Sequence, residues 1–113
     1  LEGDGTLRDY DDLATLLAGS SNVQTTLGRK TITSTTPTVD DTNNRLDIDM
    51  ADLTWLATAG NAVSKLVFCY DPDITGGTDS TLVPLTFHDC PMTPDGTDFT
   101  ATIAAAGFYR AAG

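Results

Sequence analysis

The stretch Arg45-Leu-Asp-Ile-Asp-Met50 decides the fold class, because polar and apolar residues alternate strictly along it. Alternation with a period of two places every second side chain on the same face of an extended chain, so the stretch predicts a β-strand with one buried and one wet face. Turn-forming residues precede it, in Val39-Asp-Asp-Thr-Asn-Asn44, and a Thr-rich extended segment, residues 30–35, comes before these. Together they predict a β-hairpin whose tip is residues 41–44.

Further strands are predicted toward the C-terminus. Residues 62–70 (AVSKLVFCY) form the most apolar segment and are expected at the centre of a sheet. Residues 81–88 predict the next strand, although Pro84 has no N–H to donate and favours an edge or a bulge. Residues 99–103 and 108–110 predict a closing hairpin, and Trp55, in a short link, is expected to fill the core.

The spacing of these segments predicts the architecture. About six strands at intervals of about 8–12 residues favour a small antiparallel β-sandwich or barrel. One short helix is expected at residues 6–18, where Tyr10, Leu13, Leu16 and Leu17 share a face and Gly19 ends the pattern. The polar residues 20–28 are expected to form a loop or an extended arm. We therefore divide the chain into residues 1–30, a helix and arm, and residues 31–113, a β domain.

Composition narrows the classes of function. The chain has 113 residues and a formal net charge of −10, from 16 acidic and 6 basic residues. All acidic residues except Glu2 are Asp, which favours turns and caps over helix interiors and argues against a helical bundle. Such a charge repels phosphate backbones, and no apolar run approaches the roughly 20 residues of a membrane span, so we expect no nucleic-acid or membrane partner. Because the sequence starts at Leu1 without a Met, we expect its start to be trimmed.

The cysteines leave two alternatives open. Cys69 and Cys90 each end one of two consecutive predicted strands, so they could pair in a disulfide or remain two thiols that pack as small apolar groups. A zinc site is not expected, because only His88 accompanies them and the close Cys-x-x-Cys spacing of structural zinc sites is missing.

Other motifs that could carry chemistry are incomplete. The run from Asp71 to Gly76 places oxygen-bearing side chains at alternate positions, but a calcium loop of the EF-hand type needs a Glu where Leu82 stands, so we expect an Asp-rich turn. The pair His88-Asp89 has no Gly-x-Ser-x-Gly nucleophile motif to complete a triad, and His88 is expected to be structural. We therefore predict no enzyme, no catalytic residue, no metal and no cofactor.

The order of five segments resembles a family of small phage virion structural proteins, which are often encoded near the major capsid protein. The resemblance covers roughly two-thirds of the chain, and it departs from the family at Cys90-Pro-Met92, where relatives often have a Gly-rich loop. The resembling segments are Val39-Asp-Asp-Thr-Asn-Asn-Arg-Leu-Asp-Ile-Asp49, Asp52-Leu-Thr-Trp55, Ala62-Val-Ser-Lys-Leu-Val-Phe-Cys-Tyr-Asp71, Leu82-Val-Pro-Leu-Thr-Phe-His-Asp89, and Asp98-Phe-Thr-Ala-Thr-Ile103 with Ala106-Gly-Phe-Tyr109.

The resemblance implies a virion protein without catalytic residues. We expect a decoration (cement) protein on the outer surface of the phage head, bound to the major capsid protein and to neighbouring copies of itself, as a homotrimer or another symmetric oligomer. The alternative is a tail, baseplate or head-fibre component in host adsorption, with Trp55 or Tyr109 facing a sugar.

The N-terminal segment is expected to meet the capsid, because it carries apolar and basic residues outside the β pattern. The alternative is that its helix covers one open end of the barrel. The expected contact residues are Leu7, Arg8, Val23, Leu27, Arg29 and Lys30.

Overall fold

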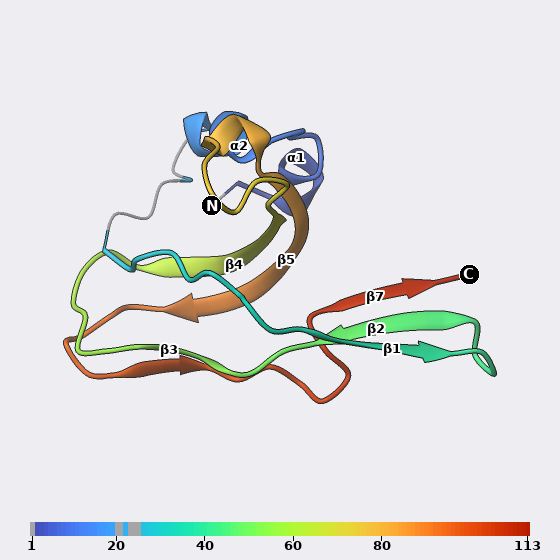
Figure 1. Cartoon of the computed structure of the whole chain (residues 1–113). Helices are drawn as coiled ribbons and strands as arrows, with labels where there is room; N and C mark the ends of the chain where they lie inside the picture. Colours follow the sequence, from blue (N-terminus) through green and yellow to red (C-terminus); the bar gives the residue numbers. More distant parts are fainter. Residues whose placement is uncertain (1, 20–21, 23–25) are drawn as a thin grey trace. The chain divides into compact units, whose positions relative to one another are not determined.

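The computed structural model describes residues 2–19, 22 and 26–113 and is mainly β (Figure 1). The antiparallel β class expected from the sequence is confirmed, and the sheets do not close into a barrel. No helix in the described part of the chain is long and apolar enough to cross a membrane. The elements are α1 (Asp4–Leu7), α2 (Leu13–Ala18), β1 (Thr36–Asp40), β2 (Arg45–Asp49), β3 (Leu53–Trp55), β4 (Val63–Tyr70), the 3₁₀ turn η1 (Asp79–Thr81), β5 (Val83–Met92), β6 (Phe99–Ala101) and β7 (Tyr109–Ala112).

The chain forms two compact units, each built from two stretches of sequence. Unit 1 comprises residues 1–25 and 61–93, and unit 2 comprises residues 26–60 and 94–113. This division differs from the boundary at residue 30 expected from the sequence. The reason is that the N-terminal helices find their apolar partners in a hairpin some 60 positions later.

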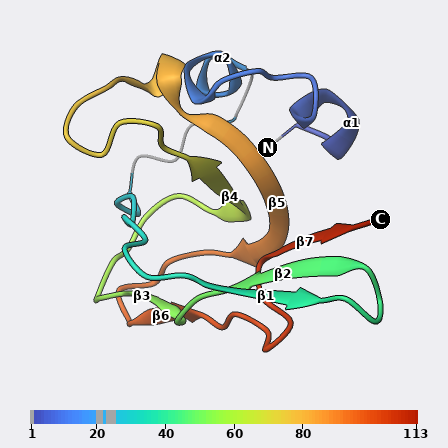
Figure 2. The ribbon, with the colours of Figure 1, turned by 45° about the vertical axis from the view of Figure 1, so that its right-hand side comes forward.

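Unit 1 is the antiparallel hairpin β4–β5 with both helices packed on it, and β5 curves along its ten residues (Figure 2). Its core is three leucines, of which Leu7 and Leu16 are almost completely buried, at 0% and 1% exposure, and Leu13 is nearly so. They pack against half-buried side chains of the hairpin, including Val67 and Phe87. Burying apolar surface in this way is the main force that can hold the helices to the strands.

The single helix expected at residues 6–18 is wrong in its extent, because the chain forms two short helices there. The first ends at Leu7, and the second begins after Asp12, whose carboxylate accepts the backbone N–H of Thr15 at 2.8 Å. A short Asp side chain that bonds a backbone N–H three residues on is a strong N-cap, so it starts a new helix. The predicted end at Gly19 is confirmed.

Three strand predictions need correction. The hairpin tip at residues 41–44 is confirmed, but β1 begins at Thr36 and not in residues 30–35. Strand β5 continues through Cys90 and Pro91 to Met92, beyond the end expected at residue 88. The last two strands do not pair with each other: β6 pairs with β3, and β7 pairs with β2. Pairing partners are chosen by burial over long sequence separations, which a local pattern does not encode.

Unit 2 contains the three-stranded sheet β1-β2-β7 and the two-stranded sheet β3-β6. Trp55 is buried, as expected, with 8% exposure, and stacks on Phe99 across β3-β6 at a centroid distance of 5.5 Å. Its indole Nε1 donates to the Gly28 carbonyl at 2.6 Å, and the Lys30 ammonium lies 5.6 Å from the ring centroid. The single Trp of the chain therefore reports on unit 2, and it holds residues 28–30 against β3.

Substitution Leu16→Ala should lower the free energy of unfolding of unit 1 by about 2–5 kcal/mol, because it leaves a cavity in a small core. Urea unfolding followed by circular dichroism, with hydrogen exchange of the β4 and β5 amides, measures the loss. Ile74→Ala is the matched control, since Ile74 is 85% exposed and should change stability little. An equal loss in the two variants would contradict the packing described for Leu16.

Candidate interaction site

The three-stranded sheet of unit 2 has two different faces. Its register aligns Thr38, Asp47 and Arg110 in one row across the strands, and Val39, Leu46 and Ala111 in the next. Because side chains alternate along a strand, the first row lies on a polar face and the second on an apolar face. The same alternation adds Asp40 and Arg45 to the polar face, and Pro37, Ile48 and Tyr109 to the apolar one.

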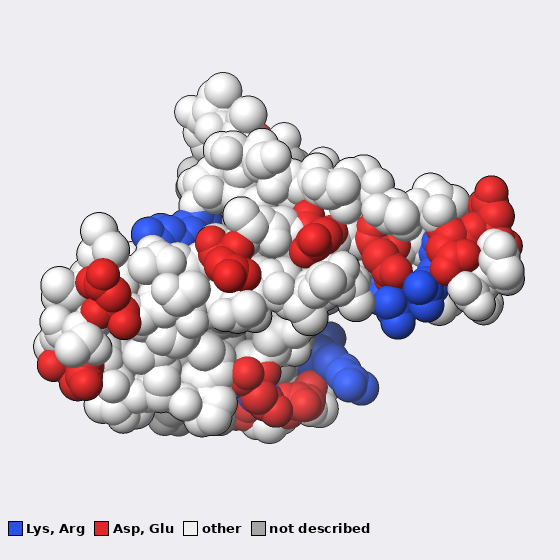
Figure 3. Space-filling view, turned by 90° about the horizontal axis from the view of Figure 1, so that it is seen from below, with Lys and Arg blue, Asp and Glu red and all other residues white. Residues whose placement is uncertain are grey.

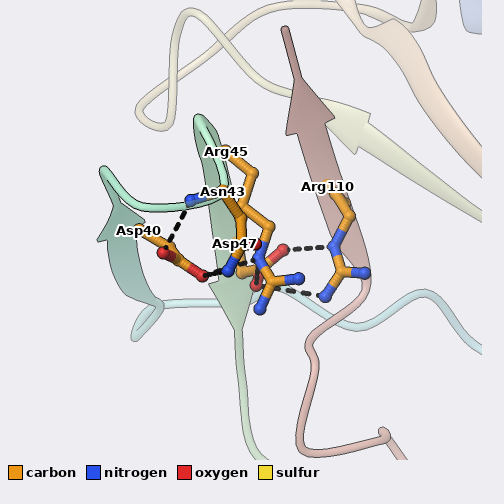
Figure 4. Close-up of polar contacts among 5 residues, drawn as sticks. All are labelled: Asp40, Asn43, Arg45, Asp47 and Arg110. Atoms are coloured by element: carbon orange, nitrogen blue, oxygen red, sulfur yellow. Dashed lines mark hydrogen bonds and ion pairs between the residues drawn. The ribbon is translucent and has the colours of Figure 1, made fainter.

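Ion pairs join all three strands on the polar face (Figure 4). Arg110 of β7 donates two hydrogen bonds to the Asp47 carboxylate of β2, from Nε at 2.6 Å and from Nη2 at 3.1 Å. Arg45 lies between two carboxylates, with its Nε 3.2 Å from Asp40 of β1 and 3.3 Å from Asp47. Asn43, in the hairpin tip, donates its side-chain amide to Asp40 at 2.7 Å. A two-pronged Arg–carboxylate contact fixes orientation as well as distance, so this network sets how β7 lies on β2.

These contacts keep the carboxylates ionised. Hydrogen bonds from Arg110 hold the pKa of Asp47 below its ordinary value, and hydrogen bonds from Asn43 do the same for the pKa of Asp40. The same contact raises the pKa of Arg110. Each group is stabilised in its charged form by a fixed neighbour, which suits a structural network rather than proton transfer.

The apolar face ends in an exposed side chain. Val39 of β1 is 69% exposed, while Leu46, Ile48 and Tyr109 are half-buried. This sheet therefore has an apolar face and, on its opposite side, a polar face joined by ion pairs; its edge strands are β1 and β7.

Gly107 positions the edge strand β7. Its φ of +85° lies in the left-handed region, and a Cβ there would collide with the backbone carbonyl oxygen of Ile48. The backbone N–H groups of Phe108 and Gly113 donate to Ile48 and Asn44, each at 3.0 Å, and so fasten both ends of β7 to β2.

Of the six residues expected to contact a capsid, the five that the structure describes are divided between the two units. Leu7 is buried in the core of unit 1, so its predicted surface role is wrong. Arg8 is exposed and lines a shallow pocket of about 320 Å³ in unit 1. In unit 2, Leu27 is half-buried, and Arg29 and Lys30 are exposed. Val23 lies outside the described residues.

The disulfide alternative is wrong, because both cysteines are thiols. The register of the β4–β5 hairpin places Cys69 opposite Pro84, six residues before Cys90. At about 3.3 Å per residue, the two cysteines lie about 20 Å apart along the strand, far beyond disulfide reach. Burial raises the pKa of the Cys90 thiol.

The Asp-rich run after β4 folds as a turn. One carboxylate oxygen of Asp73 accepts the backbone N–H groups of Thr75 and Gly76, at 3.1 and 3.2 Å, and the Thr75 hydroxyl at 2.8 Å. These hydrogen bonds lower the pKa of Asp73, and the bond from the Thr75 hydroxyl has the largest effect. Within the described ranges, no three His, Cys, Asp or Glu side chains are grouped to hold a metal ion.

His88 has structural neighbours. Its ring meets Phe68 edge-on at a centroid distance of 5.4 Å, and its Nε2 lies 3.0 Å from the Thr86 hydroxyl. The partners come from its own strand and from the paired strand β4. This packing agrees with the structural role expected for His88.

Asn22 was missed in the sequence, where it falls in a predicted loop or arm. It is 5% exposed, and its amide donates to the Glu2 carboxylate and to the Leu16 carbonyl, each at 2.8 Å. The Tyr10 hydroxyl donates to the same carboxylate at 2.7 Å, which raises the pKa of Tyr10. A lone Asn in a polar stretch carries no signal of this kind, because its partners are fixed only by tertiary packing.

Comparisons with protein-family models, curated proteins and solved structures find no match to the chain. Function is therefore inferred from the chain's own residues. The two units differ in charge: unit 2 holds four of the six basic residues, and unit 1 holds nine of the 16 acidic ones. On the face drawn in Figure 3, acidic side chains stand in separate patches rather than one cluster.

Substitution Asp47→Asn should lower the free energy of unfolding of unit 2 at pH 7. It should also make that free energy fall less between pH 7 and pH 2. The pKa of Asp47 is lower when folded than when unfolded, so its contribution is present above the unfolded value of about 3.9 and is lost as pH falls through the folded value. Urea unfolding followed by Trp55 fluorescence at pH 7 and pH 2 measures the effect. Asp41→Asn, in the exposed hairpin tip, removes the same charge as a control; a stability gap for Asp47→Asn as large at pH 2 as at pH 7 would contradict the account.

Substitution Gly107→Ala should loosen β7 from β2 and destabilise unit 2 by more than about 1 kcal/mol, because the left-handed backbone and the Ile48 carbonyl both oppose a side chain. Faster hydrogen exchange in β7 and an earlier Trp55 unfolding transition are expected. Gly28→Ala, where the added methyl meets nothing within 4 Å, serves as the control. Unchanged exchange in β7 would refute the role assigned to Gly107.

Proposed function

We propose that the chain is a non-enzymatic structural protein of a phage virion, a decoration (cement) protein bound to the major capsid protein on the outer surface of the head. The order of its motifs carries the proposal, because that order resembles small phage virion proteins. The resembling segments cover β2, β3, β4 and β6 in full and parts of β1, β5 and β7. The resemblance therefore lies in the framework of both units.

The distribution of charge supports an orientation on the shell. Unit 1 carries nine acidic and two basic residues, whereas unit 2 carries seven acidic and four basic ones. A strongly acidic unit turned toward solvent keeps particles soluble and apart. We assign the capsid contact to unit 2, where Arg29 and Lys30 are exposed and the Lys30 ammonium lies over the Trp55 ring.

The adsorption alternative receives less support from the aromatic residues. Trp55, which would face a sugar, is buried against Phe99 with 8% exposure, and Tyr109 is half-buried in the three-stranded sheet. Sugar-binding aromatic rings need an open face, so we favour the head over the tail.

Heads of the encoding phage, purified without the chain, should bind it in co-sedimentation and become more resistant to heat. The double substitution Arg29→Glu and Lys30→Glu should weaken this binding about tenfold or more, because it reverses two charges at the assigned contact. Arg8→Glu, a charge reversal in unit 1, is the matched control and should bind like the unmodified chain. Circular dichroism checks that each variant remains folded, because the single Trp lies in unit 2 and Arg8 lies in unit 1.

Failure of the unmodified chain to sediment with heads would overturn the proposed function. Equal losses in the Arg8 variant and in the double variant would place the contact elsewhere than on residues 29–30. Association with purified tails instead of heads would favour the adsorption alternative.

A further inference from the structure

Strand β7 is an edge whose outer side is open among the described residues. It pairs with β2 on one side, and no other described strand pairs with it. Its residues Arg110, Ala111 and Ala112 are exposed. An edge of this kind presents unpaired backbone groups to any strand that approaches.

The direction of these backbone groups follows from the contacts at the end of β7. The N–H of Gly113 points inward, since it donates to the Asn44 carbonyl next to β2. Backbone groups alternate in direction along an antiparallel strand, so the N–H and C=O of Ala111 also face β2. Those of Arg110 and Ala112 therefore face outward.

The opposite edge of the same sheet is protected. In β1, Pro37 has no N–H, and the strand ends in Asp40 and Asp41 at the hairpin tip. Proline and charged residues are the usual devices that keep an edge strand from pairing. Strand β7 contains neither Pro nor an acidic residue. The sheet is therefore protected against strand pairing at β1 and unprotected at β7.

Charge favours a second copy at the open edge. In a chain of net charge −10, residues 99–113 contain no acidic residue, and Arg110 is the only charged one among them. The Arg110 guanidinium is already held by Asp47. Two copies can therefore approach through β7 without setting carboxylates against each other.

We infer that β7 pairs antiparallel with β7 of a second copy, about a two-fold axis at Ala111. In this register Arg110 of each copy lies opposite Ala112 of the other, and each such pair exchanges two backbone hydrogen bonds. An axis at Arg110 would instead set two guanidinium groups directly opposite, which is unfavourable. Small side chains at 111 and 112 leave room for the second strand.

This pairing makes one continuous six-stranded sheet from two copies of β1-β2-β7. Edge-to-edge pairing about such an axis keeps like faces on the same side, so the apolar rows with Val39, Leu46 and Ile48 run on across the junction. The inference goes beyond binding to a capsid, and it is tested on the isolated chain.

A cysteine at the axis tests the register. Opposed residues of a non-hydrogen-bonded antiparallel pair have Cα atoms about 4.5 Å apart, within the range of a disulfide. Ala111→Cys should therefore give at least about tenfold more disulfide-linked dimer on mild oxidation than Ala106→Cys, which is exposed in the loop before β7. Mass spectrometry of the linked peptide identifies the 111–111 bond, with Cys69 and Cys90 kept in both variants. Equal cross-linking would overturn the inference.

Proline at each edge tests the surface. Ala112→Pro removes an outward N–H from β7 and should raise the dimer dissociation constant about tenfold or more in sedimentation equilibrium. Val39→Pro removes one from the edge of β1 and should leave the dimer unchanged; Trp55 fluorescence checks the fold of both. A chain that stays monomeric up to about 1 mM, or a dimer weakened only by Val39→Pro, would overturn the inference. Loss of head binding by Ala112→Pro in a monomeric chain would assign the edge to a capsid strand instead.

Discussion

One carboxylate organises unit 2. Asp47 on β2 accepts two hydrogen bonds from the guanidinium of Arg110 on β7. It also forms an ion pair with Arg45, which forms a second ion pair with Asp40 on β1. The contact with Arg110 joins residues 63 positions apart in the sequence, so it stabilises the tertiary pairing of two distant strands rather than a local turn. Because β7 is held in this way, it becomes an ordered edge strand, and the apolar face of the sheet keeps one register.

The excess of Asp over Glu has a physical explanation. A short carboxylate reaches backbone N–H groups within its own turn, which stabilises caps and loops. Among the described residues, six Asp side chains accept such a local hydrogen bond, and they are Asp12, Asp40, Asp49, Asp71, Asp73 and Asp95. Asp52 and Asp98 accept backbone N–H groups from distant residues, Ile103 and Ala57. Much of the acidity of the chain therefore comes from Asp residues that stabilise its turns. An acidic surface of this kind would keep a virion component that faces solvent soluble.

Features carried by local patterns could be predicted from the sequence. Alternation in residues 45–50 and turn residues at 41–44 gave the β1–β2 hairpin, and the apolar run at 62–70 gave β4, because each depends on neighbours in sequence. Features set by distant partners could not be predicted in this way. Leu7 was expected on the surface because its partners in the β4–β5 hairpin lie far along the chain, and β7 was paired with the wrong strand for the same reason. The cysteines are separated by the register of the β4–β5 hairpin, which sets Cys69 opposite Pro84, six residues before Cys90. Strand β5 also continues through Pro91, against the usual effect of proline.

The central claim is that this chain is a component of the phage head whose second unit meets the shell. A cryo-electron microscopy map of the encoding virion tests it most directly. The account predicts density for both units on the outer surface of the head, with residues 29–30 toward the capsid protein and the acidic unit 1 toward solvent. Density for the chain on the tail, or heads that carry no copy of it, would contradict the account.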